Sequence, residues 1–502
     1  MMRRSTLCLL ASTGLALFAG VPAIHAQSVD AAGATDVEER LDAMLTFMTE
    51  NIVGLSYRFA AAPRATPNGD SYTLTLPGLS LERRDVLIEL PDFEAEVTPV
   101  GDGWYRADWD FPTSITMRNP RGNERIDGSF SSDDNTLTFA PEYGVALQGN
   151  VSFEEMAFTV SEENVTALID GMQMVIDTDE EGAPHTFSTE SEMSLSGLII
   201  DVPGEGSVQL DQALFDGASE SQRLDLFALF NAAVRGLEPE SEEYLNAMLN
   251  VVSEHRDETW AAGLRFSSAL EGLQVDVDGV DVSMERLATI LGASDLDQAN
   301  ADLEIAFDMT GLETNQVPPA FAEVAPNDIT IDVTAEDLPI QQIMNVVYDA
   351  LGPHGEEAVG PKGRRAGAGP TVEQLQSIDP MVMLGLLLGS EAKLAINELL
   401  VEAPIGYLDA SGVIEPDPNA AFQAVGSLDI SIAGLADIIA FTQQMGGDAA
   451  QFAALASAIA AMGEDSTDGD GVAVKEFALE VTAAGQVLLN GNDMSAMMGM
   501  FQ

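Results

Sequence analysis

The sequence has few of the residues on which much of protein chemistry depends, namely cysteine, histidine and the basic side chains. Its 502 residues include one cysteine, Cys8, and four histidines. Cys8 falls in a leader-like N-terminal segment, so the chain after that segment has no thiol for a disulfide or for catalysis. Lys and Arg number 21 against 82 Asp and Glu, which gives a formal net charge of −61. Because such a surface repels polyanions, we expect no nucleic-acid partner.

Motifs with a fixed spacing are missing as well. The chain has no H-E-x-x-H pair, no G-x-S-x-G turn, no G-x-x-x-x-G-K-[ST] loop and no G-x-G-x-x-G after a strand. Carboxylates are so numerous that spacing selects no acid–base pair, and a hydrolase that uses two of them stays a third-ranked alternative. The sequence therefore predicts a protein that is not an enzyme, with no catalytic residue, no cofactor-binding residue, no cofactor and no metal ligand.

The N-terminus has the three parts of a secretory signal peptide. Arg3 and Arg4 supply the positive charge, an apolar run follows from Leu7 to Gly20, and "AIHAQ" offers a cleavage point after Ala26. The apolar run is short for a bilayer span, although a retained N-terminal anchor stays an alternative. We expect residues 1–26 to be removed as a signal peptide, leaving an exported chain with no transmembrane segment.

The rest of the chain contains stretches in which apolar and polar residues alternate and an amphipathic pattern follows. This plan occurs in "NDITIDVTAEDLPIQQIMNVV" (327–347), in "GSLDISIAGLADIIAFTQQM" (426–445) and, more loosely, in "LQVDVDGVDVSMERLATIL" (273–291). A parallel sheet covered on both faces would show continuous apolar runs instead. We therefore predict an α+β fold, a long curved mainly antiparallel sheet with amphipathic helices packed on one face. The alternating apolar positions define a candidate groove or core face: Ile329, Ile331, Val333, Leu428, Ile430 and Ile432.

The N-terminal part of the exported chain combines a helix with strands. Residues 35–52 have helical periodicity, and we expect Thr35 or Asp36 to cap that helix. Alternating stretches separated by Gly and Asp-Gly turns then predict a β-meander over residues 55–160.

The middle of the chain contains two further helical patterns. Residues 219–237 predict a helix with Ser219 or Ser221 as its cap, and residues 241–260 predict a second helix. These helices stand between stretches that alternate as strands do, which agrees with the α+β class.

One segment rich in Gly and Pro interrupts the chain. "LGPHGEEAVGPKGRRAGAGPTVEQ" (351–374) is typical of a linker or loop. We expect an N-terminal α+β region at 27–350, which begins with the helix and the β-meander. A C-terminal α+β region at 375–502 would continue the sheet.

Two acidic stretches come close to the EF-hand pattern without matching it. In the first, Asp276, Asp278 and Gly279 fit, but Gln274 stands at the first ligand position. In the second, Phe477 stands where a bidentate glutamate is required. We interpret both stretches as strands and acidic turns, with calcium binding as the alternative.

Aromatic and methionine clusters offer two more candidate sites. "GWYRADWDF" could form a sugar platform, but Tyr105, Trp109 and Phe111 share one strand face and are typical of a core. The methionines of the tail "NDMSAMMGMFQ" could bind copper, yet methionines spread through the chain favour packing.

Two C-terminal stretches resemble a known family. They are "AKLAINELLVEAPIGYLDASGVIEPDPNAAFQAVGSLDISIAGLADII" and "LEVTAAGQVLLNGNDM". Over residues 390–495 the chain is similar to the alphaproteobacterial exported family catalogued as domain of unknown function 2125. That family has no established activity and supplies no catalytic residues. The resemblance implies a protein of the periplasm in a Gram-negative envelope, and it extends more distantly to periplasmic families whose long curved sheets handle lipids.

Two functions from different classes follow from these patterns. In the first, the candidate face forms an apolar groove that binds or carries a lipid or other amphiphile, which needs no catalytic motif. In the second, the same residues form a filled core, and the protein is a structural component of the envelope or a binding partner of envelope proteins. An inner cavity would favour the first function, and tight packing would favour the second.

Overall fold

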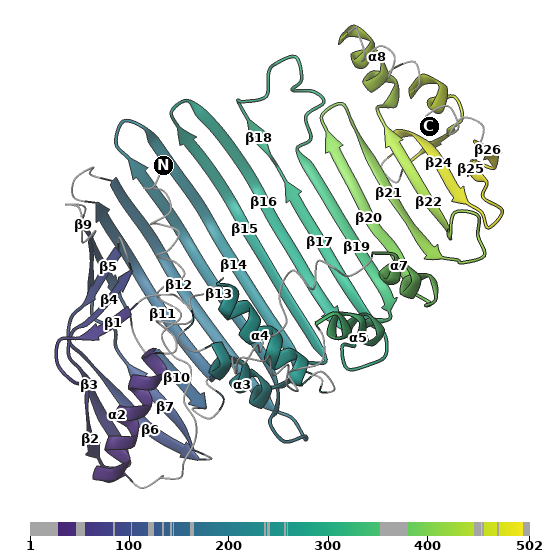
Figure 1. Cartoon of the computed structure of the whole chain (residues 1–502). Helices are drawn as coiled ribbons and strands as arrows, with labels where there is room; N and C mark the ends of the chain where they lie inside the picture. Colours follow the sequence, from purple (N-terminus) through teal and green to yellow (C-terminus); the bar gives the residue numbers. More distant parts are fainter. Residues whose placement is uncertain are drawn as a thin grey trace, which may run out of the picture. The chain divides into compact units, whose positions relative to one another are not determined.

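Antiparallel strands make up most of the computed structural model of this chain (Figure 1). It describes residues 29–46, 56–83, 86–101, 103–118, 125–132, 135–140, 143, 145–160, 165–234, 237, 241–255, 258, 260–351, 380–445, 453, 456–468 and 471–494. The predicted α+β class with a mainly antiparallel sheet is confirmed. The predicted signal peptide, most of the linker segment at 351–374 and residues 495–502 of the methionine tail lie outside the described residues.

The chain divides into two units. Each unit consists of two segments, and the segments of the two units alternate along the sequence. Unit 1 comprises Met1–Leu264 and Val346–Ile378, and unit 2 comprises Arg265–Asn345 and Asp379–Gln502. The first boundary between the units falls at Leu264, inside the N-terminal region predicted at 27–350.

Unit 1 is organised around the long strand β11 (Val145–Val160). One edge of β11 pairs with β10 and then with β9, and the other edge pairs with β12. From β10 the pairing continues through β7, β6 and β3 to β2, and from β9 it continues through β8, β5 and β4 to β1. From β12 it continues through β13 to β14. The strands are β1 (Ser56–Phe59), β2 (Arg64–Asn68), β3 (Ser71–Leu76), β4 (Leu79–Arg83), β5 (Val86–Leu90), β6 (Phe93–Gly101), β7 (Trp104–Trp109), β8 (Ser114–Arg118), β9 (Arg125–Ser131), β10 (Asn135–Ala140), β12 (Val165–Glu180), β13 (Thr186–Val202) and β14 (Gly206–Arg223).

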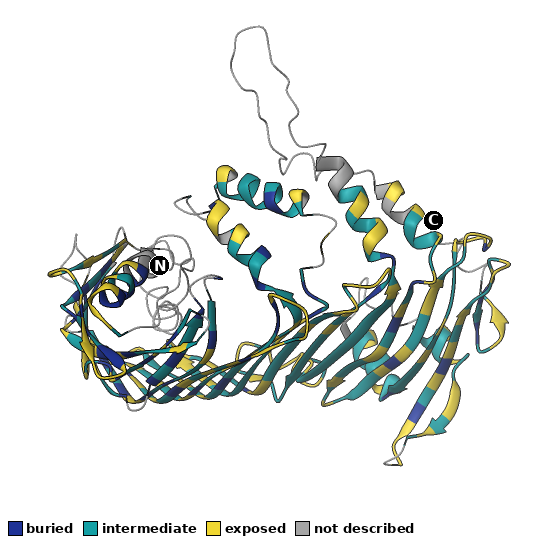
Figure 2. Ribbon diagram, turned by 90° about the horizontal axis from the view of Figure 1, so that it is seen from below, coloured by how far each residue is buried: buried dark blue, intermediate teal, exposed yellow. Residues whose placement is uncertain are grey.

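The N-terminal strands of unit 1 curl around the helix α2 (Ala31–Thr46), as Figure 2 shows. The enclosed side chains form one buried core to which both branches of the sheet contribute, including Tyr72 and Leu137, which are 0% and 1% exposed. The predicted core role of Tyr105, Trp109 and Phe111 is confirmed, because all three belong to this core.

The two predicted helices in the middle of the chain are α3 (Leu224–Val234) and α4 (Glu242–Glu254). The hydroxyl of Ser241 accepts a hydrogen bond from the amide of Tyr244 and so caps α4. The expected cap of α3 at Ser219 or Ser221 is wrong, because both residues belong to β14, whose alternation continues to Arg223.

The expected start of the first helix is also wrong. The helix α2 begins at Ala31, and the Asp30 carboxylate accepts hydrogen bonds from the amides of Ala32 and Gly33, each at 2.9 Å. Thr35 and Asp36 instead lie inside the helix. There the Asp36 carboxylate forms an ion pair one turn along the same helix.

Unit 2 adds its strands one after another. The strand β17 pairs with β16, with β19 on its other edge, and the pairing continues through β20, β21 and β22 to β24. The strands are β15 (Gly263–Val277, in unit 2 from Arg265), β16 (Val280–Ser294), β17 (Ala301–Thr310), β18 (Glu313–Thr314), β19 (Asp328–Leu338), β20 (Lys393–Ala403), β21 (Gly406–Pro416), β22 (Ala424–Ala433), β23 (Glu464–Thr467), β24 (Ala473–Val481), β25 (Val487–Leu489) and β26 (Asn492–Asp493). The helices α7 (Pro380–Leu388) and α8 (Leu435–Met445) belong to the same unit, and α5 (Ile340–Leu351) begins in it.

Two of the three predicted strand–helix repeats have that structure. The strand β19 leads into α5, and β22 leads into α8. The third stretch, 273–291, contains no helix and lies in β15 and β16, with a turn at Asp278 and Gly279 whose φ angles of 55° and 78° suit a tight hairpin. The helical prediction failed there because two consecutive residues, Glu285 and Arg286, are both exposed. Two polar residues in a row shift the alternation of the apolar residues by one position, and the resulting spacing imitates that of a helix.

Candidate functional site: an apolar sheet face

The six residues predicted for the candidate face lie on β19 and β22 of unit 2. They are Ile329, Ile331 and Val333 on β19, and Leu428, Ile430 and Ile432 on β22. The intervening strands join them in rows, because Ile331 lies opposite Leu399 of β20. Leu399 lies opposite Ala410 of β21, which in turn lies opposite Ile430. Directly opposed residues of an antiparallel pair point to the same side, so all six share one face.

The same face extends over the neighbouring strands. On β17, Met309 pairs with Ile329 and Ile305 pairs with Val333, and on β16 Leu291 pairs with Ile305. We call this surface the apolar face. Besides the six predicted residues it includes Leu287, Leu291, Leu303, Ile305, Phe307, Met309, Ala335, Leu394, Ile396, Leu399, Val401, Leu408, Ala410 and Ile414.

The apolar face differs sharply in charge from the opposite side of the same strands. None of the residues that define the apolar face is ionisable. The alternate positions carry acidic residues such as Asp332, whose carboxylate accepts a hydrogen bond from the Asn397 amide at 3.0 Å. Since burying an unpaired charge is costly, the strands direct their carboxylates away from the apolar face.

The side chains of the apolar face are only partly shielded from solvent. All six predicted residues are half-buried. Exposure is greater toward one end of the strands, where the paired Leu291 and Ile305 are 53% and 55% exposed. Leu394 and Ile414, also a pair, are 39% and 45% exposed. The buried hydrophobic clusters of the described residues both lie in unit 1.

The helix α8 lies toward the other end of these strands. Its Phe441 packs edge-on against Phe321 of the loop before β19, with ring centroids 6.2 Å apart. Figure 1 shows α8 at one end of the strands of unit 2 and α7 at the opposite end.

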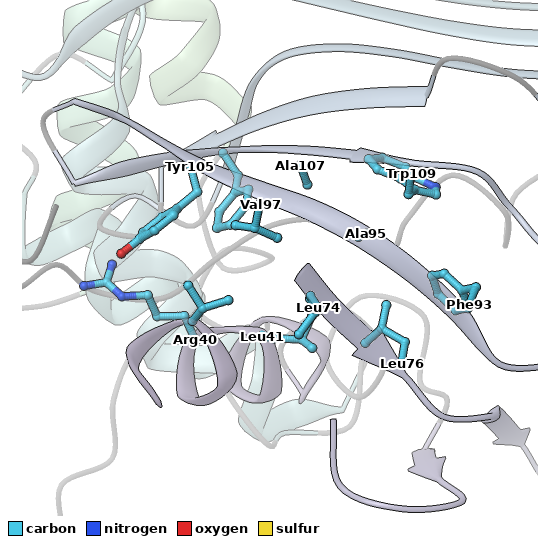
Figure 3. A pocket seen from close by; sticks show the side chains of 12 residues that line it. Arg40, Leu41, Leu74, Leu76, Phe93, Ala95, Val97, Tyr105, Ala107 and Trp109 are labelled. Carbon is cyan, nitrogen blue, oxygen red and sulfur yellow. The ribbon is translucent and has the colours of Figure 1, made fainter. Parts of the chain in front are cut away.

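Unit 1 contains a small enclosed cavity between α2 and the N-terminal strands (Figure 3). Its volume is about 30 Å³, and its walls include Leu41, Leu74, Trp109 and Tyr105. A space of this size holds one or two water molecules. It is therefore a packing void of the unit 1 core and not an acyl-chain site.

A polar group borders that cavity. The Tyr105 hydroxyl donates a hydrogen bond to the Asp36 carboxylate at 3.0 Å, and the Arg40 guanidinium forms an ion pair with the same carboxylate at 2.7 Å. Burial of the ring, followed by its hydrogen bond to ionised Asp36, raises the pKa of Tyr105 to about 12. The three residues tie α2 to β7, which is a structural role.

Two histidines of unit 1 form ordinary structural pairs. The Tyr143 hydroxyl lies 2.7 Å from His185 Nδ1, and His255 Nδ1 lies 2.8 Å from Glu258. Within the residues that the structure describes, no group of three or more His, Cys, Asp or Glu is placed to hold a metal ion. The stretch 274–285, considered as a calcium loop, belongs to β15, its turn and β16.

Sequence reasoning missed the most exposed part of the apolar face. Leu303, Ile305 and Phe307 alternate with Glu304 and Ala306 in β17, and this alternation was a signal that could have identified the strand. No sequence signal distinguishes the exposed Ile305 from the half-buried Ile331, because exposure depends on what the fold places over each residue.

Among the described residues, no helix is both long enough and apolar enough to cross a bilayer. Comparison of the chain with protein-family models, with curated proteins and with solved structures found no match.

Proposed function

We propose that this chain is a non-enzymatic exported protein that binds a lipid or another amphiphile, with the acyl chain lying on the apolar face of unit 2. The observation that carries the proposal is a sheet face that has no ionisable residue from β17 to β22 and whose aliphatic side chains, apart from the buried Ala410, stay half-buried or exposed. Large apolar surfaces of this kind mark binding sites on soluble proteins.

The geometry of the face suits a long apolar ligand. Its rows run across β17, β19, β20, β21 and β22, and neighbouring strands lie about 4.8 Å apart. Each row offers a continuous track of apolar groups, such as Phe307, Ile331, Leu399, Ala410 and Ile430. Apolar area contributes about 25 cal/mol per Å² when it leaves water, so an acyl chain along a row is bound without catalytic or charged groups.

The proposal includes the compartment. The leader-like residues 1–26 would direct the chain to the periplasm, where lipids move between membranes through water. Membership of the family catalogued as domain of unknown function 2125 is part of the same proposal. If the chain binds no amphiphile, we would favour a structural role with envelope proteins as partners.

Binding of a fluorescent fatty acid to the purified chain tests the proposal, with a matched pair of variants. Ile331→Gln places an amide on the apolar face, whereas Thr330→Gln places the same amide on the opposite side of the same strand. We expect Ile331→Gln to raise Kd about tenfold, because it removes roughly 1–1.5 kcal/mol of apolar contact. Thr330→Gln should leave Kd within about twofold.

Native mass spectrometry of the chain from gentle preparations gives an independent reading. A reproducible co-purifying lipid, depleted in the Ile331→Gln variant, supports the proposal. A bare mass together with no fatty-acid binding would overturn it and would favour the structural role.

A further inference from the structure

The helix α7 has a composition that is unusual for this acidic chain. Its nine residues, PMVMLGLLL, are all apolar or glycine, and no ionisable residue occurs from Pro380 to Ser390. A helix that is apolar on every side has no polar face to turn toward water, and such helices are normally enclosed by apolar surroundings.

The described residues do not enclose α7 in this way. Met381 is 67% exposed and Val382 is 46% exposed. Gly385 is exposed and Leu386–Leu388 are half-buried, so none of the α7 residues whose burial is described is fully buried.

An exposed row of the apolar face lies close to α7 along the chain. We call Leu303, Ala335, Leu394 and Ile414 the exposed row, since they pair in that order across β17, β19, β20 and β21. Leu394 is the second residue of β20, which α7 precedes by a four-residue connection. Figure 1 shows α7 at the end of the strands where the exposed row lies.

The composition of α7 favours a lipid surface as the surface to which it binds. A protein groove covers one stripe of a helix, whereas the hydrocarbon of a bilayer surrounds a helix that is apolar all round. At about 1.5 Å per residue, nine residues span about 14 Å, which reaches into one leaflet and does not cross the bilayer. The net charge of −61 repels anionic headgroups, so the surface is zwitterionic.

We propose that α7 docks this protein on a zwitterionic lipid surface and that the exposed row beside it is where an amphiphile passes between that surface and the apolar face. The passage rests on the proposed amphiphile binding, whereas the docking can be measured separately. Docking brings the partly exposed leucine and isoleucine side chains of the row next to the acyl chains of the leaflet.

Flotation of the full chain with phosphatidylcholine vesicles tests the docking, with two variants matched in residue type and exposure. Val382→Asp places a carboxylate on α7, and Val472→Asp places one at an equally exposed valine, 46%, in the turn before β24. We expect Val382→Asp to reduce the vesicle-bound fraction about tenfold, because a carboxylate strongly opposes entry into hydrocarbon. Val472→Asp should bind the vesicles like the unchanged chain. Both variants carry the same N-terminal apolar run, so any contribution of that run to vesicle binding cancels when they are compared.

Fatty-acid binding without vesicles separates this proposal from the proposed function. Val382→Asp should bind the free fluorescent fatty acid as the unchanged chain does, yet deliver it to phosphatidylcholine vesicles about tenfold more slowly. Equal flotation of the two variants, or flotation only with anionic vesicles, would overturn the docking and leave amphiphile binding standing. If the unchanged chain floats with the vesicles but does not bind the fatty acid, the amphiphile proposal alone would be overturned.

Discussion

The strands β3 in unit 1 and β19 in unit 2 have the same alternating pattern and very different surroundings. In β3, Tyr72, Leu74 and Leu76 are 0%, 4% and 4% exposed. In β19, Ile329 and Ile331 are only half-buried. Alternation therefore specifies which side chains share a face, and it does not specify whether anything covers that face.

The difference arises from how each sheet continues. In unit 1 the sheet branches at β11, and its two branches curl so that their apolar faces meet each other and α2. Aromatic side chains fill the space between them, with Phe111 and Phe153 ring centroids 5.0 Å apart. From β16 to β22 the strands of unit 2 follow one another, and the described residues form no second layer of strands opposite their shared face.

The largest expected effect contrasts two leucine truncations. Leu137→Ala removes a side chain that is 1% exposed in the unit 1 core, and we expect a loss of about 3 kcal/mol in the free energy of unfolding. Leu394→Ala removes one that is 39% exposed on the apolar face, and the loss should stay below about 1 kcal/mol. Urea unfolding checks this, with tryptophan fluorescence for unit 1, since Trp104, Trp109 and Trp260 all belong to it. Hydrogen exchange reports on unit 2, and equal losses would remove the distinction between the two units.

A bound amphiphile should stabilise one unit and not the other. At a ligand concentration of 100 times Kd, binding contributes about 2.7 kcal/mol to the state that binds. We expect hydrogen exchange to slow in β19 to β22 when a fatty acid is added, while the tryptophan-detected transition of unit 1 stays unchanged. Protection confined to the strands around α2 would place the ligand in unit 1 and would contradict the comparison.

Alkaline pH should weaken the unit 1 core through Tyr105. Its pKa rises from the ordinary 10.0 to about 12 in the folded chain, chiefly because of burial. The folded state thus keeps a proton that the unfolded state releases, so this contribution is complete below pH 10 and is lost as pH rises from about 10 to about 12. We expect the stability of unit 1 to fall more steeply with pH over that window in tryptophan-detected unfolding. Tyr105→Phe should show a shallower decline, and an unchanged slope would count against this assignment.

The smallest expected effect concerns the helix that closes the unit 1 core. Asp30→Ala removes the side chain that caps α2, and we expect a loss of about 1 kcal/mol in the stability of unit 1. Asp30→Asn should retain most of that stability, because an asparagine side chain also accepts the amide hydrogen bonds. A similar loss in both variants would assign the effect to the charge of Asp30 instead of its capping geometry.

Much of the fold was predictable because the spacing of apolar residues along the sequence matches the period of the strands and helices that form. The α+β class, the sharing of a strand face by Tyr105 and Trp109, and the strand–helix units at β19 and β22 all follow from periodicity. The cap of α2 was missed because Asp30 precedes a segment, AAGAT, that has no apolar periodicity. The helical part expected within 273–291 was wrong because the shifted alternation at Glu285 and Arg286 has the spacing of a helix.

The sequence alone determined which residues lie together on each side of a strand, since alternation at a period of two follows from backbone geometry. It also determined that the carboxylates of β19 and β22 point away from their isoleucines. Only the tertiary structure decided that Tyr72 is enclosed while Ile305 faces solvent, because enclosure depends on strands and helices that are distant in sequence. The apolar face stays half-buried for a physical reason: among the described residues of unit 2, no second sheet layer pairs over the rows between β16 and β22.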